Sequence, residues 1–343
     1  MVTAVSARAV PSVIFLTVLS EGISTVQDLF SRKINYLRLS VTGRCNFGCA
    51  YCSVGRGDCP RSDELSVDEI RGIVRAAASL GCTKVRLTGG EPLIRHDIAE
   101  ICRTVMNVPG VKKLCLTTNG YYLSRHAGIL MDAGVSCVNI SLDTADDERF
   151  YKITGRRALG DVLSGIDAAL ASGFDRVKIN AVLLHGVNDD VKSVRDLASL
   201  TERYPVDLRF IELMPSRLIG ESYGRSFVSA DLVFESLPGL ERSETPEDAE
   251  GVAEMYRIPG APGRVGIISP MSACFCHRCS RIRVLSDGRV RPCLLRNTEY
   301  DLRGLSYEDT VAVLRKAVLM KPLNYGEEIG TGAAQCEMKR IGG

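Results

Sequence analysis

The chain has 343 residues, of which 45% are hydrophobic and 24% are charged, and its formal net charge is +2. This length suits one large domain, or a large domain with a smaller one, and the small net charge excludes a chain-wide polyelectrolyte. The chain has 13 cysteines, an odd number that fits a set of paired disulfides poorly. Its alternation of strands and helices is typical of a cytosolic enzyme. These features indicate reduced thiols and metal ligands, so we expect a cytoplasmic protein without nucleic-acid or membrane partners.

Residues 1–33 are expected to form an N-terminal extension whose role the sequence leaves open. The extension contains the apolar run VPSVIFLTVL, but SEGISTV after it offers no clear small-x-small cleavage site. The run is also too short to span a bilayer as a helix. Export remains the alternative to a loosely packed extension.

From residue 34 onward, short apolar strands alternate with helical stretches, which predicts parallel strands joined by crossover helices. The expected strands are 35–42, 83–88, 112–118, 135–142, 175–183 and 206–213. The expected helices are 66–80, 96–106, 124–132, 159–172 and 190–203. Six such units are two short of an eight-unit barrel, so a partial (βα)6 barrel and a doubly wound sheet both fit the count.

The two faces of the expected strands favour the partial barrel. Successive side chains of a strand point to opposite faces, and in five of these strands one face is apolar and the other polar. A doubly wound sheet covers both faces with helices and would be apolar on both. The polar face therefore predicts a barrel whose lumen binds a ligand, with these residues along it: Arg38, Ser40, Thr42, Lys84, Arg86, Thr88, Cys115, Thr117, Asn119, Asn139, Ser141, Asp143, Lys178 and Asn180.

The alternation ends near residue 225. Short strand-like pieces follow around 254–258, 264–268, 282–286 and 289–293, with a helix near 306–318. We expect three parts: the extension 1–33, the partial barrel 34–225, and a smaller α+β module 226–343.

The segment CNFGCAYC places Cys45, Cys49 and Cys52 on a loop directly after the first strand. Three thiolates at this spacing can bind three irons of one [4Fe–4S] cube and leave the fourth iron free for a small molecule. Zinc sites more often use CxxC pairs. A set of neighbouring buried thiols is the structural alternative, which the loop composition around Asn46 and Gly48 disfavours.

CNFGCAYC resembles the signature of the radical S-adenosylmethionine (SAM) family, and GGEP (89–92), TTNG (117–120) and SLD (141–143) after the next strands agree with it. The resemblance implies a partial six-unit barrel and a SAM molecule chelated by the open iron. Reduction of SAM would then give methionine and a 5′-deoxyadenosyl radical, in a site that excludes water. The SAM contacts implied by matching positions are Tyr51, Gly89, Gly90, Glu91, Thr117, Asn119, Ser141 and Met214.

Cys276, Cys279 and Cys293 repeat the three-thiol pattern near the end of the chain. A closed zinc site is one interpretation, with Cys274 or Cys336 as the fourth ligand, although Cys274 lies awkwardly close to Cys276 for a shared tetrahedron. A second [4Fe–4S] cluster with an open iron is the other interpretation, and we prefer it.

Seven cations are expected around one cavity, which predicts a polyanionic ligand such as a triphosphate. Guanidinium groups bind phosphate in bidentate fashion, and the chain lacks the GxxxxGK[ST] pattern of a P-loop. For any one of them a surface ion pair is the simpler explanation, so the argument rests on the set. The set is Arg38, Lys84, Arg86, Lys178, Arg209, Arg281 and Arg283.

The two cysteine segments together resemble the GTP 3′,8-cyclase family of molybdenum cofactor biosynthesis, from about residue 34 to the terminal IGG. The resemblance implies that the seven cations bind GTP, that the second cluster binds guanine, and that Gly342 and Gly343 reach the active site. Arg281, Arg283, Gly342 and Gly343 would act in catalysis beside Cys45, Cys49 and Cys52. The radical would take hydrogen from C3′ of GTP, C3′ would attack C8, and reduction would give 3′,8-cyclo-7,8-dihydro-GTP.

The implied partners are GTP, a flavodoxin- or ferredoxin-like electron donor, a downstream cyclic pyranopterin monophosphate synthase, and a second copy in a homodimer. Three segments depart from the family pattern: SVGRGD after Cys52, the additional Cys274, and PSRLIGES (215–222). The rival hypotheses are a radical SAM enzyme that modifies peptides or tetrapyrroles, and a non-catalytic zinc or iron–sulfur protein. GGEP and the polar strand face argue against the second.

Overall fold

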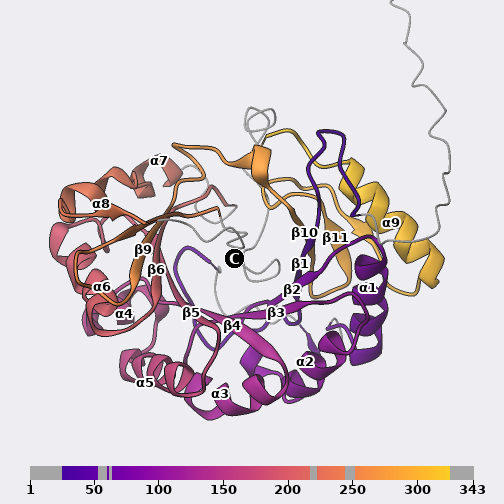
Figure 1. Ribbon diagram of the computed structural model, residues 1–343, viewed down its shortest axis with the longest axis horizontal. Helices are drawn as coiled ribbons and strands as arrows, with labels where there is room; N and C mark the ends of the chain where they lie inside the picture. Colours follow the sequence, from indigo (N-terminus) through magenta and orange to yellow (C-terminus); the bar gives the residue numbers. More distant parts are fainter. Residues whose placement is uncertain (1–24, 53–59, 62–63, 217–221, 244–251, 325–343) are drawn as a thin grey trace, which may run out of the picture.

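The computed structural model describes residues 25–52, 60–61, 64–216, 222–243 and 252–324 (Figure 1). The predicted strands are all present in it, with ends within a few residues of those expected. In chain order the strands are β1 (Tyr36–Ser40), β2 (Lys84–Thr88), β3 (Lys113–Thr118), β4 (Val135–Ser141), β5 (Arg176–Leu183), β6 (Asp207–Glu212), β7 (Glu241–Arg242), β8 (Glu254–Arg257), β9 (Arg264–Ile268), β10 (Arg281–Val284), β11 (Arg289–Arg291) and β12 (Tyr300–Asp301).

The predicted helices are present too, and the described residues add some that the sequence pattern did not predict, among them α4, α7 and α8. The helices are α1 (Val67–Ser79), η2 (Pro92–Ile94), α2 (Ile98–Met106), α3 (Leu123–Asp132), α4 (Asp147–Thr154), α5 (Leu159–Ala171), α6 (Val191–Arg203), α7 (Tyr223–Ser226), α8 (Asp231–Ser236), η4 (Cys276–Arg278) and α9 (Tyr307–Leu319). Among the described residues, no helix has both the length and the apolar content needed to cross a bilayer.

All described strands belong to one sheet of order β12-β11-β10-β1-β2-β3-β4-β5-β6-β9-β8-β7. The eight strands from β10 to β9 are parallel, and antiparallel strands extend both ends. Figure 1 shows the sheet curving around the centre of the molecule, with the helices on its outer side. The expected partial barrel is therefore confirmed, and strands from the C-terminal part continue it at both edges.

The outer side of the sheet is apolar because the strands alternate as predicted. Leu37 and Leu39 of β1 are fully buried and belong to one continuous core with side chains of the surrounding helices. In α1 the buried residues Ile70, Ile73 and Val74 recur with the helical period and face this core. The alternate residues of the strands face the concave side, so the core lies outside the sheet and leaves the inside to polar groups.

The N-terminal part of the described chain is tied into the fold. The Val26 N–H donates to Leu80 O (2.8 Å), and the Ile34 N–H donates to Val26 O (3.0 Å). Between them, Asp28 and Arg32 form a buried ion pair with Oδ2 and Nε 2.5 Å apart. Residues 25–33, which the sequence placed in the N-terminal extension, thus pack against α1 and against the C-terminal segment that Arg32 contacts.

Candidate active site

The first cysteine segment (residues 45–52) lies at the carboxyl end of β1. Its backbone is fixed to the end of α4, because the Gly48 N–H donates to Thr154 O (2.9 Å) and the Ala50 N–H donates to Ile153 O (3.1 Å). A turn closes at Cys52, whose N–H donates to Cys49 O (3.0 Å). The three predicted thiols are thereby held in one short segment at the mouth of the barrel.

Gly89 and Gly90 allow the chain after β2 to run against the first cysteine segment. The Gly90 N–H donates to Thr42 O (2.8 Å), and the Glu91 N–H donates to Arg44 O (2.8 Å). A Cβ at Gly90 would lie 2.1 Å from Arg44 O, and one at Gly89 would lie 2.4 Å from Thr42 O. Only glycine permits this approach, and the φ of Gly89 (149°) favours glycine as well.

Glu91 is fully buried and fixes the loops around this site. Its carboxylate accepts hydrogen bonds from the Asn119 N–H (2.6 Å), the Leu93 N–H (2.9 Å) and the Thr118 hydroxyl (2.8 Å). Burial raises its pKa to about 7. The Asn119 side chain then reaches the cysteine segment, with Nδ2 2.8 Å from Asn46 Oδ1 and 3.8 Å from Cys45 Sγ.

Tyr51, a predicted SAM contact, points back to the end of β4. Its hydroxyl donates to Asp143 Oδ2 (2.7 Å), while Asp143 Oδ1 accepts from the Val182 N–H (2.8 Å). Burial raises the pKa of Asp143 to about 6. The remaining predicted SAM contacts, Thr117, Ser141 and Met214, lie at or just beyond the ends of β3, β4 and β6 and are partly buried.

The thiols of the first segment lie in surroundings that disfavour negative charge. Burial raises the pKa of Cys45 to about 11, with a smaller contribution from the Glu91 carboxylate. Burial, followed by Asp143, also holds the pKa of Cys49 well above its ordinary value. Among the described residues, no three His, Cys, Asp or Glu side chains converge on a point where a single ion would bind.

The second cysteine segment (residues 276–293) includes η4, β10 and β11. The chain just before it is fixed by Glu212, a fully buried residue at the end of β6. The Glu212 carboxylate accepts hydrogen bonds from the N–H groups of Met271 and Ser272, both at 3.0 Å. Despite burial, the Arg281 and Lys321 charges lower the pKa of Cys279 to about 6. The register pairs Arg281 with Tyr36 of β1, so this segment adjoins the lumen.

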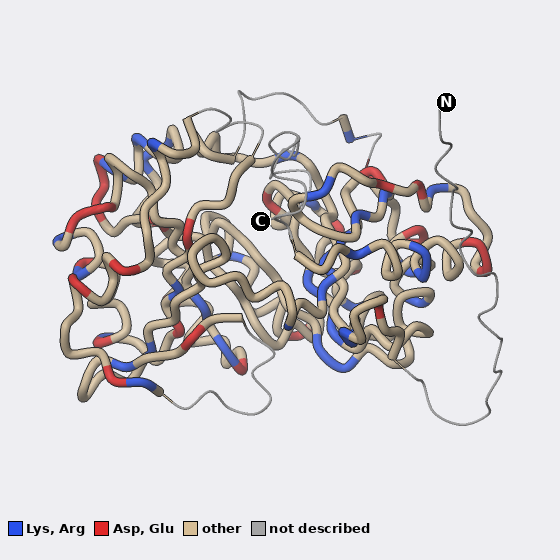
Figure 2. Tube along the Cα trace, turned by 90° about the horizontal axis from the view of Figure 1, so that it is seen from above, with Lys and Arg blue, Asp and Glu red and all other residues tan. Residues whose placement is uncertain are grey.

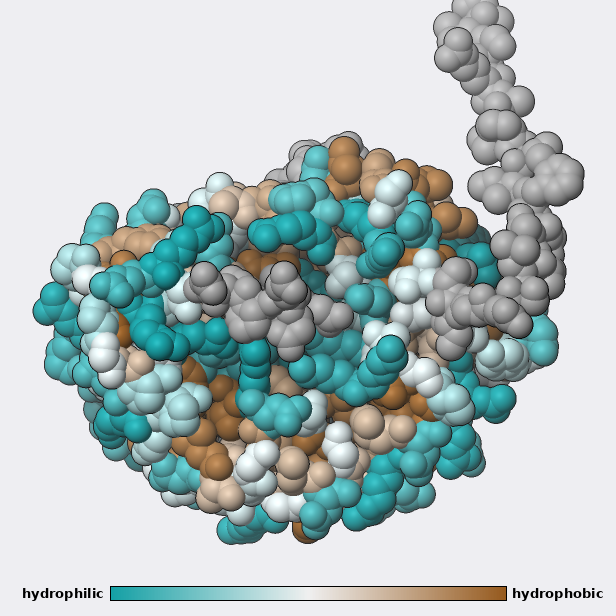
Figure 3. Space-filling view, in the orientation of Figure 1, coloured by the Kyte–Doolittle hydropathy of each residue, from teal (hydrophilic) through white to brown (hydrophobic). Residues whose placement is uncertain are grey.

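The predicted cations do come together on the concave face. Strand register places Arg38 beside both Arg86 and Arg283, and Asn180 beside Arg209. Figure 2 shows Lys and Arg on the inner strands as well as at the surface, and in Figure 3 hydrophilic residues gather across the middle of the face shown. The set therefore shares one space, as the alternation of the strands predicted.

Burial and the neighbouring positive charges lower the pKa of several cations in this group, while Tyr36 raises that of Arg86. Burial and the Arg283 guanidinium hold the pKa of Arg38 well below its ordinary value. Burial, followed by Arg209, lowers the pKa of Lys178 to about 8. The pKa of Arg209 is lowered by burial too. Arg86 is held in place by Tyr36, and its Nη1 donates to Leu116 O (3.2 Å).

Several predicted features lie outside the described residues: Gly342, Gly343, Cys336, the segment 53–59 after Cys52, and residues 217–221. Cys274, the possible extra ligand, is described and exposed. Sequence reasoning missed Glu212, Asp28, Arg32 and Lys321 around the second cysteine segment. They belong to distant parts of the chain and match no local motif, so only the fold brings them there.

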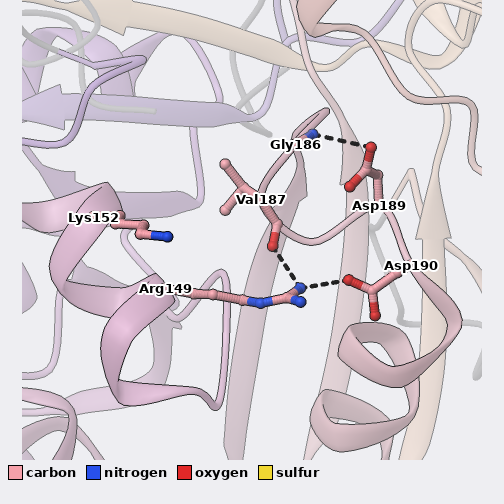
Figure 4. Close-up of a pocket in the computed structure, with 6 residues that line it drawn as sticks. All are labelled: Arg149, Lys152, Gly186, Val187, Asp189 and Asp190. Carbon is pink, nitrogen blue, oxygen red and sulfur yellow. Dashed lines mark hydrogen bonds and ion pairs between the residues drawn. The ribbon is translucent and has the colours of Figure 1, made fainter.

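A small pocket of about 240 Å³ lies between α4 and the segment that joins β5 to α6. In Figure 4, Arg149 points to the Val187 carbonyl and to Asp190, while Asp189 faces the Gly186 N–H. Arg149 Nη1 lies 2.8 Å from Val187 O and 2.5 Å from Asp190 Oδ2. Arg149 therefore ties α4 to the segment that joins β5 to α6.

Comparison with known families divides the chain in two. Residues 39–198 match the radical SAM superfamily, and residues 206–326 match the family described as Molybdenum Cofactor Synthesis C. A GTP 3′,8-cyclase of Alkaliphilus metalliredigens is 42% identical over 305 residues, 87% of this chain and 93% of the relative. The chain belongs to the GTP 3′,8-cyclase family. Another member, from Peptoclostridium acidaminophilum, is 40% identical and aligns over 93% of this chain and 99% of its own length.

Solved structures agree on the fold. Native anSMEcpe with bound AdoMet superposes with a TM-score of 0.58 at 18% identity, covering 89% of this chain and 87% of the other. Streptococcus suis SuiB bound to S-adenosylmethionine gives a TM-score of 0.53 at 17% identity, covering 85% of this chain and 65% of the other. At such identity the likeness shows the fold alone.

Proposed function

We propose that the protein converts GTP to 3′,8-cyclo-7,8-dihydro-GTP, the first step of molybdenum cofactor biosynthesis, and that it does so as a lyase of the radical SAM type. The observation that carries the proposal is the shared concave face: it brings the predicted cations into one space beside two cysteine segments. Membership of the GTP 3′,8-cyclase family supports the same reaction.

The thiols suit iron–sulfur clusters better than a single ion. Three thiolates on one short loop suit one [4Fe–4S] cube with an open iron, whereas structural zinc sites are usually closed by four ligands. We assign Cys45, Cys49 and Cys52 to the first cluster, and Cys276, Cys279 and Cys293 to the second. When bound, a reduced cluster of this kind supplies the electron that cleaves SAM into methionine and the 5′-deoxyadenosyl radical.

The residues around the first segment have the properties that a cationic cofactor requires. SAM carries a positively charged sulfonium group, and the carboxylates of Glu91 and Asp143 have the largest charge effects on Cys45 and Cys49. Glu91 uses its oxygens to fix Leu93, Thr118 and Asn119, so we assign it the orientation of the SAM site. Asp143 does the same for Tyr51.

The cations of the concave face would bind and neutralise the triphosphate. Four of them form two pairs, Arg38 with Arg283 and Lys178 with Arg209. Burial first, and then the neighbouring Arg283 or Arg209, lowers the pKa of Arg38 and of Lys178. A triphosphate would relieve that repulsion, and guanidinium groups would fix its orientation through paired hydrogen bonds. We further propose that Arg281 and Arg283 connect the nucleotide to the second cluster, and that Gly342 and Gly343 complete the site.

The proposed partners follow from the chemistry. The reaction needs an external one-electron donor of the flavodoxin or ferredoxin type, and its cyclised product would pass to a cyclic pyranopterin monophosphate synthase. We also propose a homodimer and a cytoplasmic, reducing setting, which the 13 cysteines favour. A radical SAM enzyme acting on a peptide is the rival, but a peptide gives no reason for this set of inward cations.

Anaerobic reconstitution tests the proposal. We expect about eight irons per chain from two four-iron clusters, and 5′-deoxyadenosine formation that depends on GTP when dithionite and SAM are supplied. The product should carry a new C3′–C8 bond, measured by mass spectrometry and NMR. About four irons together with bound zinc would refute the second cluster, and SAM cleavage indifferent to GTP would refute the substrate.

A further inference from the structure

Lys321 lies directly after α9, and its amine is buried against the second cysteine segment. The residue is 4% exposed. Its Nζ donates to Arg281 O at 2.7 Å and to Pro292 O at 2.9 Å, and lies 3.8 Å from Cys279 Sγ. All three partners belong to the second cysteine segment. Cys279 is a predicted ligand, Arg281 lies two residues after it, and Pro292 directly precedes the predicted ligand Cys293.

The number of contacts matches an ammonium group. A protonated lysine has three N–H donors, and the three acceptors around Nζ use one each. A neutral amine would leave one of them without a donor. Lys321 also interacts electrostatically with both Cys279 and Cys293. The geometry thus places one positive charge between two predicted ligands that are separated by 13 residues in the sequence.

The surrounding chain prevents this charge from swinging away. Arg32 Nη2 donates to Pro322 O (2.6 Å), the residue after Lys321, and its Nη1 donates to Leu323 O (3.2 Å). The same Nη1 donates to Cys276 O (2.7 Å), so Arg32 connects the end of α9 to the third predicted ligand. Asp28 pairs with Arg32 in turn, with both side chains almost fully buried.

We propose that Lys321 is a positioning residue that holds the Cys279 and Cys293 parts of the second cysteine segment together and provides the second cluster with a fixed positive charge, while Arg32 connects this arrangement to Cys276. This rests on the proposed second cluster. Adding an electron makes a thiolate-ligated cluster more negative, so a nearby cation stabilises the reduced form and raises its reduction potential. Without the charge, the second cluster should be harder to reduce, while the first should be unaffected.

The test separates the effect of the positive charge at position 321 from the effect of its hydrogen bonds. Lys321→Gln keeps N–H donors but removes the charge, and Lys321→Arg keeps the charge. Lys316→Gln is the matched control, because Lys316 lies in the last turn of α9, five residues before Lys321, is exposed, and packs its Nζ over the Tyr300 ring at 4.9 Å instead. Reduction potentials of both clusters would be measured by EPR-monitored redox titration of the reconstituted full chain, with the first cluster as internal reference.

In Lys321→Gln we expect the equilibrium constant for one-electron reduction of the second cluster to fall at least about tenfold. This corresponds to a reduction potential about 59 mV more negative. Lys321→Arg and Lys316→Gln should stay near wild type. Loss of the second cluster alone in Lys321→Gln, with retention in Lys321→Arg, would also support the proposal. An unchanged potential in Lys321→Gln, or an equal shift in Lys321→Arg, would overturn it. Only about four irons in the wild type would instead refute the second cluster itself.

Discussion

The two cysteine segments carry three predicted ligands each, but their electrostatic surroundings are opposite. In residues 45–52 the carboxylates of Glu91 and Asp143 add to the effect of burial and raise the pKa of Cys45 and Cys49. In residues 276–293 the charges of Arg281 and Lys321 act against burial and lower the pKa of Cys279 to about 6. The charges around the first segment favour a cationic ligand, and the charges around the second segment favour an anionic ligand.

This difference suits the proposal that two three-cysteine segments serve different small molecules. Ligand thiolates fix a cluster, but they do not select what its open iron binds. Selection has to come from neighbouring charge, and here carboxylates accompany the segment assigned to SAM while cations accompany the segment assigned to GTP. If this comparison is right, substitutions in one segment should impair that segment's cluster and ligand and leave the other segment's cluster and ligand unaffected.

The largest expected effect is the loss of one cluster. Cys279→Ala should remove about four irons and abolish cyclisation, because two thiolates cannot hold the cube, while leaving the first cluster and SAM binding in place. Cys45→Ala should remove the other four and abolish SAM cleavage. Iron and sulfide analysis with isothermal titration of SAM would measure both.

Cys274→Ser is the control for these variants, since Cys274 is exposed and adjoins the same segment. It should keep about eight irons. If instead Cys274→Ser lost iron as Cys279→Ala does, Cys274 would be a ligand and the closed zinc-like site would regain support.

A smaller effect is expected from Arg283→Ala. Arg283 is buried beside Arg38, and we place it on the triphosphate, so its removal should weaken GTP binding about 10- to 100-fold. Iron content and SAM affinity should not change. Arg278→Ala is the matched control because Arg278 lies in η4 and is exposed. Equal GTP affinity in the Arg283 variant and the wild type, measured by equilibrium dialysis, would remove Arg283 from the pocket.

The smallest effect concerns pH. In the free protein the pKa of Lys178 is about 8, so the amine loses its proton as pH rises above that value. Bound triphosphate favours the charged form and raises the pKa, so binding takes up a proton above pH 8. GTP affinity should therefore fall as pH rises, by up to about tenfold per pH unit.

Lys178→Arg tests this linkage, because arginine keeps its proton throughout the range. The variant should lose the Lys178 part of the slope between pH 8 and 9.5, measured by calorimetry in buffers of different ionisation enthalpy. Identical slopes in variant and wild type would show that Lys178 does not face the phosphates.

Much of this arrangement was predictable from the sequence because it depends on short-range patterns. The alternation in LRLS and KVRLT is enough to put Arg38 and Arg86 on the inner face, and the register confirms it. The helix α4 was missed because its polar segment DERFYKIT buries only Phe150, Ile153 and Thr154, too few apolar positions for a periodic signal.

What could not be predicted depends on contacts between distant parts of the chain. Asp28, Arg32 and Lys321 match no motif, yet Arg32 and Cys276, which are 244 residues apart, share a hydrogen bond. The pairing of β10 with β1 and of β9 with β6 is of the same kind, since parallel strands far apart in sequence leave no turn signal between them. The position of Gly342 and Gly343 in the active site stays a prediction, because both lie outside the described residues.

The sheet order has a consequence for how the chain is made. Strand β9 completes one edge of the six-strand barrel and β10 completes the other, and both are synthesised after β6. A nascent chain that stops at residue 212 would expose the unpaired backbones of β1 and β6 together, which are sites for aggregation. Pairing of both barrel edges must then await the last third of translation.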